Sequence, residues 1–324
     1  MTRAGKVLLF RCIAVGVPVA AGIALSLWLP RGDDSGAIYL QEPGHEKTGH
    51  RYLYDSEFGW RNIPGWRATT YDRPLVINSK GLRDREYAYE KPAQTRRILV
   101  LGDSYAWGYG VKGEETFAKV LEEQLARRDP DNWEVLNAGV SGWGTDQEYL
   151  YLMREGFKFS PDIVVVALFL LNDPENNVYS RQYGLDKPLF LNESLELVNV
   201  PVPKPGAGAV LQKSATDPIV LTVSILAGMA EACAEQDCRL VVMKFGCFLF
   251  PDRPRTRERN GAFSTEYSRR LKGAFLDLDA EFEASGFDAV HLLTGNRDGH
   301  WNAFGHLQTG QILYRFLAKH GLLE

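Results

Sequence analysis

The sequence predicts a three-layer α/β/α sandwich built on a parallel sheet, and two features of the chain after residue 96 carry this prediction. Short apolar segments alternate there with segments whose apolar residues recur at helical spacing. Residues 163–171 are apolar without interruption, which is typical of a central parallel strand buried on both faces. The 31 Gly and 16 Pro form no repeating tract, which excludes collagen-like, coiled-coil and solenoid proteins.

The strands and helices are expected in alternating order along this part of the chain. The predicted strands are residues 98–101, a segment beginning at 135–136, and residues 163–171, 239–245 and 273–278. The predicted helices are a segment carrying Phe117, Val120, Leu121 and Leu125, then residues 145–156 and 219–233, and a terminal helix from about 302 to 321. Residues 174–217 form a long excursion between these elements, and loops of this length are typical of lids or binding elements.

The N-terminal segment is expected to be a membrane anchor. Residues 13–29 carry no charge, and the basic residues of this end of the chain flank them without any acid. The positive flank predicts a cytoplasmic N-terminus and a periplasmic or extracellular remainder, anchored in the cell membrane by one transmembrane helix. A cleaved signal peptide and a buried core helix are the alternatives for the same segment.

Three parts follow from this reading of the chain. Residues 1–31 are the anchor, residues 32–95 a stalk with an aromatic-rich cover segment, and residues 96–324 the catalytic domain with its excursion at about 174–217. Residues 52–89 are rich in Tyr and Trp and lack helical period, so short strands and loops are expected there. A hydrophobic cover on the main domain is favoured, and a sugar-stacking surface is the alternative.

Charge and cysteine content exclude several functions. The formal net charge of −4 gives no basic face for phosphates, so nucleic acid is not an expected partner. The 4 cysteines include no CxxC pair, so the sequence predicts no metal site and no cofactor. Cys233 and Cys238 are either a local disulfide in an oxidising compartment or two thiols.

Residues that can carry chemistry follow the predicted strands. Because the carboxyl ends of parallel strands meet at one edge of a sheet, these residues are expected to converge. Ser104 is the candidate nucleophile, His300 its base, and Asp298 the carboxylate that orients the histidine. The backbone N–H groups of Ser104 and Gly142 and the amide of Asn172 are the candidate oxyanion hole.

Other readings of single motifs compete with this one. A serine at a turn is often only a helix cap, and His306 or His291 could replace His300 as the base. Residues 108–113 match GxGxxG, but they do not occupy the strand-to-helix turn of a dinucleotide site. The remaining candidates are three tryptophans near the site, which line a substrate pocket or merely pack: Trp107, Trp143 and Trp301.

The chain carries, in order, the motifs GDSY, NAGVSG, ND and DGHW. Together they resemble the SGNH (GDSL) hydrolase superfamily over about residues 96–321. The resemblance implies a flavodoxin-like fold and the same roles for the five site residues above. Leu170 departs from the family pattern, which has glycine there, and Arg297 stands where many members place the Asp. The Asp-x-His spacing followed by Trp, and residues 78–83, look like those of alginate O-acetyltransferase-like and other membrane-anchored members.

The expected function is a serine esterase that hydrolyses O-acyl, above all O-acetyl, esters of a cell-envelope or exported glycan. The expected partners are this acylated carbohydrate, or another small ester, and the membrane. An O-acetyltransferase with the same triad is the alternative, and it would require an acetyl-donor partner. A second alternative is a non-catalytic envelope protein that binds glycan.

Overall fold

The computed structural model describes residues 37–41, 51–70, 72–129, 132–294 and 299–324. Residues 38–324 form one compact unit. The predicted anchor, at residues 1–31, and most of the predicted stalk lie outside the described residues.

A five-stranded parallel sheet forms the centre of this unit, as predicted. Its strands, in chain order, are β6 (Arg96–Gly102), β7 (Trp133–Asn137), β8 (Ile163–Phe169), β13 (Arg239–Phe245) and β14 (Ala274–Asp277). Their spatial order is β14-β13-β8-β6-β7, which is the flavodoxin-like order. The chain reverses its direction of winding between β6 and β8, so a ligand-binding crevice is expected where these two strands end.

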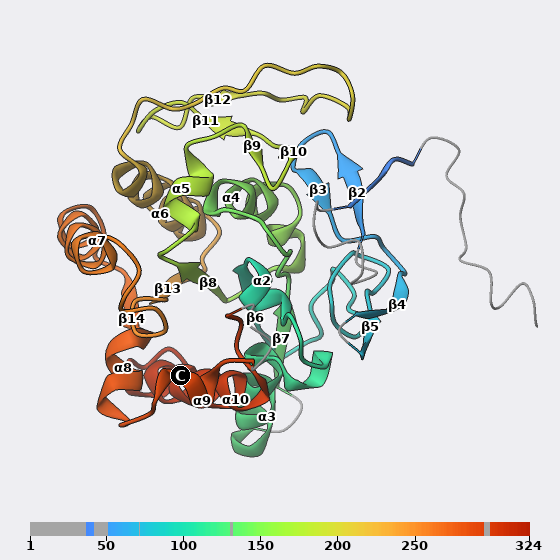
Figure 1. The fold of residues 1–324 in the computed structure, drawn as a ribbon. Helices are drawn as coiled ribbons and strands as arrows, with labels where there is room; N and C mark the ends of the chain where they lie inside the picture. Colours follow the sequence, from blue (N-terminus) through green and yellow to red (C-terminus); the bar gives the residue numbers. More distant parts are fainter. Residues whose placement is uncertain (1–36, 42–50, 71, 130–131, 295–298) are drawn as a thin grey trace, which may run out of the picture. The chain divides into compact units, whose positions relative to one another are not determined.

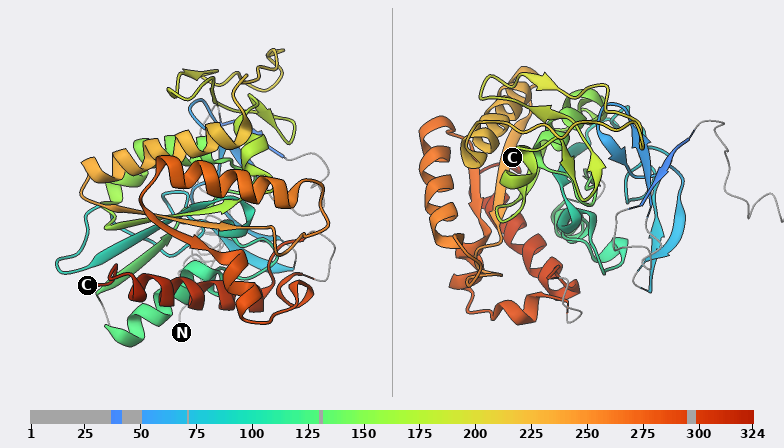
Figure 2. Two further views of the ribbon diagram at one scale, coloured as in Figure 1. Left: turned by 90° about the vertical axis from the view of Figure 1, so that its left-hand side faces the viewer. Right: turned by 45° about the horizontal axis from the view of Figure 1, so that its top comes forward.

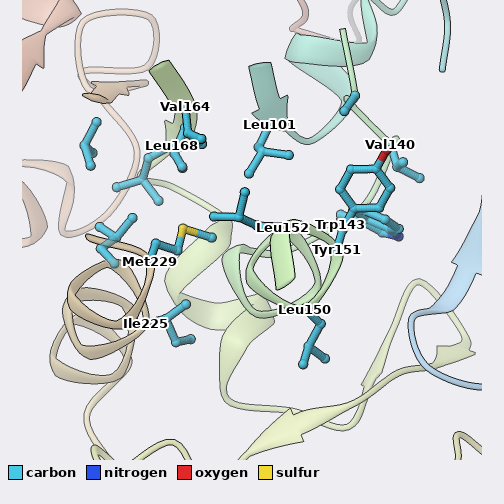
Figure 3. Close-up of a cluster of buried hydrophobic side chains, with 14 of the residues drawn as sticks. Leu101, Val140, Trp143, Leu150, Tyr151, Leu152, Val164, Leu168, Ile225 and Met229 are labelled. Carbon is cyan, nitrogen blue, oxygen red and sulfur yellow. The ribbon is translucent and has the colours of Figure 1, made fainter. Parts of the chain in front are cut away.

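Helices cover both faces of the sheet (Figures 1 and 2). One face carries α4 (Thr145–Arg154), α6 (Pro218–Glu235) and α7 (Thr256–Arg270), and the other carries α3 (Phe117–Arg128), α8 (Leu278–Ala284) and α10 (Ala303–Lys319). The side chains of β6 alternate between them: Leu99 and Leu101 enter the first core, whereas Ile98 and Val100 enter the second. Figure 3 shows Leu101 of the first core beside Leu152 of α4 and Met229 of α6.

Helix α6 is a core helix, although its length and composition would allow it to cross a membrane. More than half of its apolar window is buried within the domain. Asp217 caps its N-terminus by accepting hydrogen bonds from the backbone N–H groups of Ile219 and Val220. Among the described helices it is the one that meets the criteria for a span.

The aromatic segment after residue 51 forms small antiparallel sheets. Strands β1 (Tyr39–Leu40), β2 (Tyr52–Asp55) and β3 (Gly59–Arg61) make one, and β4 (Arg67–Thr70) and β5 (Arg73–Val76) make another. Tyr52, Phe58 and Trp60 are buried in the first core. The Trp60 indole donates a hydrogen bond to the carbonyl of Ser141 at 3.1 Å. For these three side chains the structure shows the hydrophobic cover and not the sugar-stacking surface.

The excursion contains structure that the sequence pattern does not predict. It begins with α5 (Asp173–Asn177) and continues through two hairpins, β9 (Arg181–Gln182) with β10 (Leu185–Asp186), and β11 (Leu189–Phe190) with β12 (Leu197–Val198). The short elements elsewhere are α2 (Ser104–Trp107), η2 (Gly113–Glu115), η3 (Gly156–Phe159) and α9 (Ala289–Leu292).

Candidate active site

Ser104 is the first residue of α2, directly after the end of β6. Asp103 caps this short helix, because its carboxylate accepts a hydrogen bond from the backbone N–H of Tyr105 at 2.9 Å. Asp103 is fully buried, while Ser104 is half-buried. The turn therefore presents the Ser104 hydroxyl at the carboxyl edge of the sheet, at the crevice between β6 and β8.

His300 lies opposite this serine. Its Nε2 is 2.7 Å from the Ser104 Oγ, a distance at which the ring can accept the hydroxyl proton. The loop around it is held by a hydrogen bond from the Thr294 N–H to the His300 carbonyl at 2.8 Å, and by one from the Tyr105 hydroxyl to the Gly299 carbonyl at 2.6 Å. The rings of Tyr105 and Tyr109 lie 4.9 and 4.8 Å from the imidazole. The imidazole is therefore held by contacts on several sides.

The other histidines that the sequence offers as a base lie elsewhere. His291 is exposed on α9. His306 is buried on α10, where its Nδ1 accepts a hydrogen bond from the backbone N–H of Phe117 at 3.2 Å. Burial lowers the pKa of His306 to about 3, so this ring stays neutral at physiological pH. Asp298, the predicted orienting carboxylate, lies outside the described residues.

Asn172 and Gly142 both face the same cavity as Ser104 and His300. Asn172 follows β8, and its Nδ2 donates a hydrogen bond to Asp103 at 3.2 Å. Burial raises the pKa of Asp103, whereas the hydrogen bonds from Tyr105 and Asn172 oppose this shift. Gly142 has a φ of +81°, a conformation that a side chain rarely adopts.

Leu170, the residue that departs from the family pattern, does not disturb this geometry. Its side chain is buried in the first core, and its backbone N–H donates to the Phe245 carbonyl at 3.0 Å. Its φ is not positive, so no glycine is needed at this position of the chain. The Asn172 amide reaches the site in spite of the substitution.

The cavity at Ser104 has a volume of about 350 Å³. Its lining comes from the ends of several strands and from the excursion: Ser104, Tyr105, Tyr109, Ser141, Gly142, Phe169, Asn172, Tyr183, Phe250, Arg253 and His300. Sequence analysis missed Phe250 and Arg253, although their place shortly after β13, at the same sheet edge, is a signal that could have found them. Sequence analysis also missed Tyr183, which lies in the excursion and belongs to no motif.

The three tryptophans are packing residues, which is one of the two roles that the sequence leaves open for them. Trp107, Trp143 and Trp301 are all fully buried, and none lines the cavity at Ser104. The Trp143 indole donates to the Trp60 carbonyl at 2.9 Å, which joins the cover segment to the main core. Their proximity to site residues in sequence does not place them in the cavity, because neighbouring side chains point in different directions.

The GxGxxG-like segment at residues 108–113 has a structural role. The buried guanidinium of Arg83 donates hydrogen bonds to the carbonyls of Trp107 at 2.8 Å and Val111 at 2.6 Å. Burial lowers the pKa of Arg83 to about 10. Arg83 therefore holds the loop that follows the nucleophile helix, and it is a supporting residue that the sequence analysis did not identify.

Four carboxyl groups are fully buried near the site: Asp103, Asp146, Glu148 and Asp173. The ammonium of Lys187, also fully buried, forms an ion pair with Asp146. Burial raises the pKa of Glu148 well above its ordinary value, and the charges of Asp103 and Asp146 raise it further. The protonated form of Glu148 is therefore favoured. Within the described ranges, no cluster of His, Cys, Asp or Glu is arranged to hold a metal ion.

The chain is similar to several solved structures. No curated protein matches the chain. Among solved structures, TesA is 19% identical with a TM-score of 0.47, and 69% of this chain and 99% of that chain are covered. The esterase EstA from Pseudoalteromonas sp. is 16% identical with a TM-score of 0.44, covering 69% and 97%. A two-domain esterase active on acetylated mannans is 15% identical with a TM-score of 0.44, covering 69% and 49%.

A family model gives the assignment. The model of the GDSL-like lipase/acylhydrolase family matches residues 100–307, which span the sheet from β6 to the start of α10 and include Ser104, Asn172 and His300. The chain therefore belongs to the GDSL-like lipase/acylhydrolase family and is an ester-hydrolysing enzyme.

Proposed function

We propose that this protein is a serine esterase that removes O-acyl groups, above all acetyl groups, from a glycan. Ser104 is the nucleophile, His300 the general base, and Asp298 the carboxylate that orients the imidazole. The observation that carries the proposal is the 2.7 Å distance between His300 Nε2 and Ser104 Oγ within one cavity.

The reaction follows from the positions of these groups. As the Ser104 Oγ attacks the ester carbonyl carbon, its proton passes to His300 Nε2. The negative charge on the carbonyl oxygen is stabilised by the backbone N–H groups of Ser104 and Gly142 and by the Asn172 amide. Collapse of the tetrahedral intermediate releases the alcohol, which takes the proton from His300. Water then attacks the acyl-serine by the same route, releasing the carboxylic acid and restoring the serine.

The size and the lining of the cavity support a small acyl group on a carbohydrate as the substrate. At about 350 Å³ the cavity has the size of a small-molecule site. Its wall combines aromatic rings with polar groups such as Ser141 and Arg253, and the guanidinium of Arg253 lies 4.3 Å from the centre of the Phe250 ring. Sugars use such mixtures of flat apolar faces and hydrogen-bonding groups.

The cell envelope is the proposed location of this activity. The basic-flanked apolar segment at residues 13–29 supports a single-pass anchor with a cytoplasmic N-terminus. The catalytic domain is then periplasmic or extracellular, next to envelope or exported glycans. Fractionation of cells followed by protease treatment of intact spheroplasts tests this location, because an extracytoplasmic domain is digested and a cytoplasmic one is protected.

An O-acetyltransferase is the second candidate. The Asp298-Gly299-His300-Trp301 segment resembles the alginate O-acetyltransferase-like branch, and this observation favours it. A sugar hydroxyl would take the place of water in the second half of the reaction, and a partner protein would supply the acetyl group. The same Ser104 and His300 serve both reactions.

The experiment that tests the proposal uses the purified full chain and 4-nitrophenyl acetate, alone and with oligosaccharide acceptors. If acetate is the main product, and if its release is lost in Ser104→Ala, the result supports the esterase proposal. Acetylated oligosaccharide as the main product supports the transferase. Equal inertness of the wild type and Ser104→Ala toward acetyl, butyryl and feruloyl esters contradicts both.

A further inference from the structure

Tyr183 of the excursion forms part of the catalytic cavity, although it belongs to no family motif. Its ring lies directly over Gly142, since a Cβ built on this glycine would be only 3.1 Å from the Tyr183 Cδ2. Burial and the charge of Asp103 raise the pKa of the phenol, while the side-chain amides of Asn172 and Asn176 act in the opposite direction. Tyr183 thus borders both Gly142 and Asn172, the two residues proposed to bind the oxyanion.

The hairpin that carries Tyr183 is closed by contacts between its own two strands and is tied to α4 by an ion pair. Arg181 pairs with Asp186 across it at 2.7 Å, and the Lys187 backbone N–H donates to the Ser180 carbonyl at 2.9 Å. The Lys187 ammonium is buried in its ion pair with Asp146 at the start of α4.

The cover segment closes on the same hairpin. A Cβ at Gly59 would lie 2.3 Å from the Asp186 carbonyl oxygen, which is too close for any side chain. Strand β3 therefore packs directly against the backbone of the hairpin. A loop held by a buried ion pair, a cross-strand pair and close backbone packing is a fixed wall of the cavity. Of the two roles expected for the excursion, this arrangement favours the binding element.

The geometry of ester hydrolysis determines which part of the substrate faces this wall. The leaving oxygen must lie near His300, whose ring contacts Tyr105 and Tyr109. The carbonyl oxygen points to Gly142 and Asn172. The acyl chain takes the remaining direction at the tetrahedral carbon, within the same cavity, whose wall includes Tyr183.

We infer that Tyr183 is a specificity-determining residue that limits the acyl group to acetyl or a similarly short chain. This inference rests on the proposed esterase function, and it adds the structural reason for a short acyl group. A rigid aromatic wall rejects additional methylene groups sterically, and removing it opens space that apolar chains can fill.

The test compares kcat/KM of the full-length protein for 4-nitrophenyl acetate, butyrate and hexanoate. We expect the wild type to prefer acetate, and Tyr183→Ala to raise the hexanoate-to-acetate ratio by about tenfold or more. Tyr183→Phe keeps the ring, so its ratio should remain that of the wild type. Tyr183→Asn is a second small variant, because asparagine tolerates the φ of +49° at this position.

A matched control separates this role from general damage. Tyr89 is 38% exposed, close to the 37% of Tyr183, and lies outside the catalytic cavity. Tyr89→Ala should leave the chain-length ratio unchanged. Labelling of Ser104 by a small phosphonate reports whether the site is intact in each variant.

Two outcomes would overturn the inference in distinguishable ways. If Tyr183→Ala and Tyr183→Asn are labelled normally and keep the wild-type ratio, Tyr183 does not select the acyl chain, and the esterase proposal stands. If the wild type hydrolyses none of the esters and resists the phosphonate, the esterase proposal itself fails, and the inference fails with it.

Discussion

The side-chain amide of Asn172 donates a hydrogen bond to the carboxylate of Asp103 at 3.2 Å. The two residues follow adjacent strands, β8 and β6, and Asp103 directly precedes the candidate nucleophile. This bond fixes the orientation of the amide, with its nitrogen toward the nucleophile turn. An oxyanion donor is useful only if it is held in place before the charge develops, and this hydrogen bond provides such preorganisation.

Replacement of Asn172 by Ala is therefore expected to lower kcat by about 10²–10³-fold, with a much smaller effect on KM. The amide interacts with the charge that develops in the transition state, whereas the neutral ester carbonyl gains little from it. Steady-state kinetics with 4-nitrophenyl acetate measure both constants. Thermal unfolding of the same variant controls for damage to the fold. A kcat within threefold of the wild type in a folded variant would remove Asn172 from the oxyanion hole.

Glu148→Gln is expected to stabilise the protein at pH 8 and to have little effect at pH 4. The pKa of Glu148 in the folded protein is raised by burial and by the neighbouring carboxylates. Above about pH 4.3 the glutamate is ionised in the unfolded chain but still protonated in the folded protein. Folding then requires the uptake of a proton, so the free energy of unfolding falls as the pH rises from about 4.3 to the folded-state pKa. Glutamine does not titrate, so the Glu148→Gln variant does not lose this stability as the pH rises.

Urea denaturation across this pH range measures the effect. Glu283→Gln is the control, because Glu283 is exposed on α8 and the variant makes the same chemical change outside the buried carboxyl groups. A Glu148→Gln curve parallel to that of the wild type would show that the pKa of Glu148 is not raised in the folded protein.

Lys187→Met is expected to destabilise the protein by about 3–5 kcal/mol. The Lys187–Asp146 pair is fully buried, so removing the ammonium leaves an uncompensated carboxylate inside the domain. The double variant Lys187→Met/Asp146→Asn should recover much of the loss, because it removes both charges. Equilibrium unfolding in urea gives the free energy of each variant. Additive losses in the double variant would mean that the two side chains do not stabilise the fold as a pair.

If the proposed extracytoplasmic location is right, Cys233 and Cys238 are expected to form a disulfide. The backbone N–H of Cys238 donates to the Cys233 carbonyl at 2.9 Å, and a hydrogen bond between the two thiols raises the pKa of Cys233 and lowers that of Cys238. They are free thiols in the structure, and an oxidising compartment converts such a pair to a disulfide.

Alkylation of the denatured protein before and after reduction, followed by peptide mass analysis, tests this expectation. Cys247 is the internal control, because it should react under both conditions. Alkylation of Cys233 and Cys238 without reductant would contradict the disulfide. The disulfide is one expected consequence of the extracytoplasmic location, so this result would also count against that location.

The fold was predictable because its signals are local and repeated. The apolar segment at residues 163–169 is short and rich in Val and Ile, which favours a buried strand, and the terminal helix, α10, is amphipathic. The strand prediction extended two residues too far, to Leu171, because an apolar turn and an apolar strand look alike in sequence. Helix α7 was missed because its exposed face is highly charged and its buried residues are few.

The candidate site was predictable where residues follow strands and, for His300, where a motif directly precedes the terminal helix. Ser104, Asn172 and His300 share the cavity, as their placement in the sequence predicts. Tyr183 could not be found, since it reaches the cavity through an excursion whose position depends on tertiary contacts such as the buried Lys187–Asp146 pair. The sequence left the role of the tryptophans open, because distance along the chain says nothing about which way a side chain points.

The most direct test of the account is hydrolysis of 4-nitrophenyl acetate by the wild type, Ser104→Ala and His300→Ala, together with phosphonate labelling. We expect each substitution to lower kcat by about 10³-fold or more, and labelling to modify Ser104 in the wild type and to be lost in Ser104→Ala. Hydrolysis that persists at the wild-type rate in Ser104→Ala, or phosphonate attached to another residue, would contradict Ser104 as the nucleophile that His300 activates.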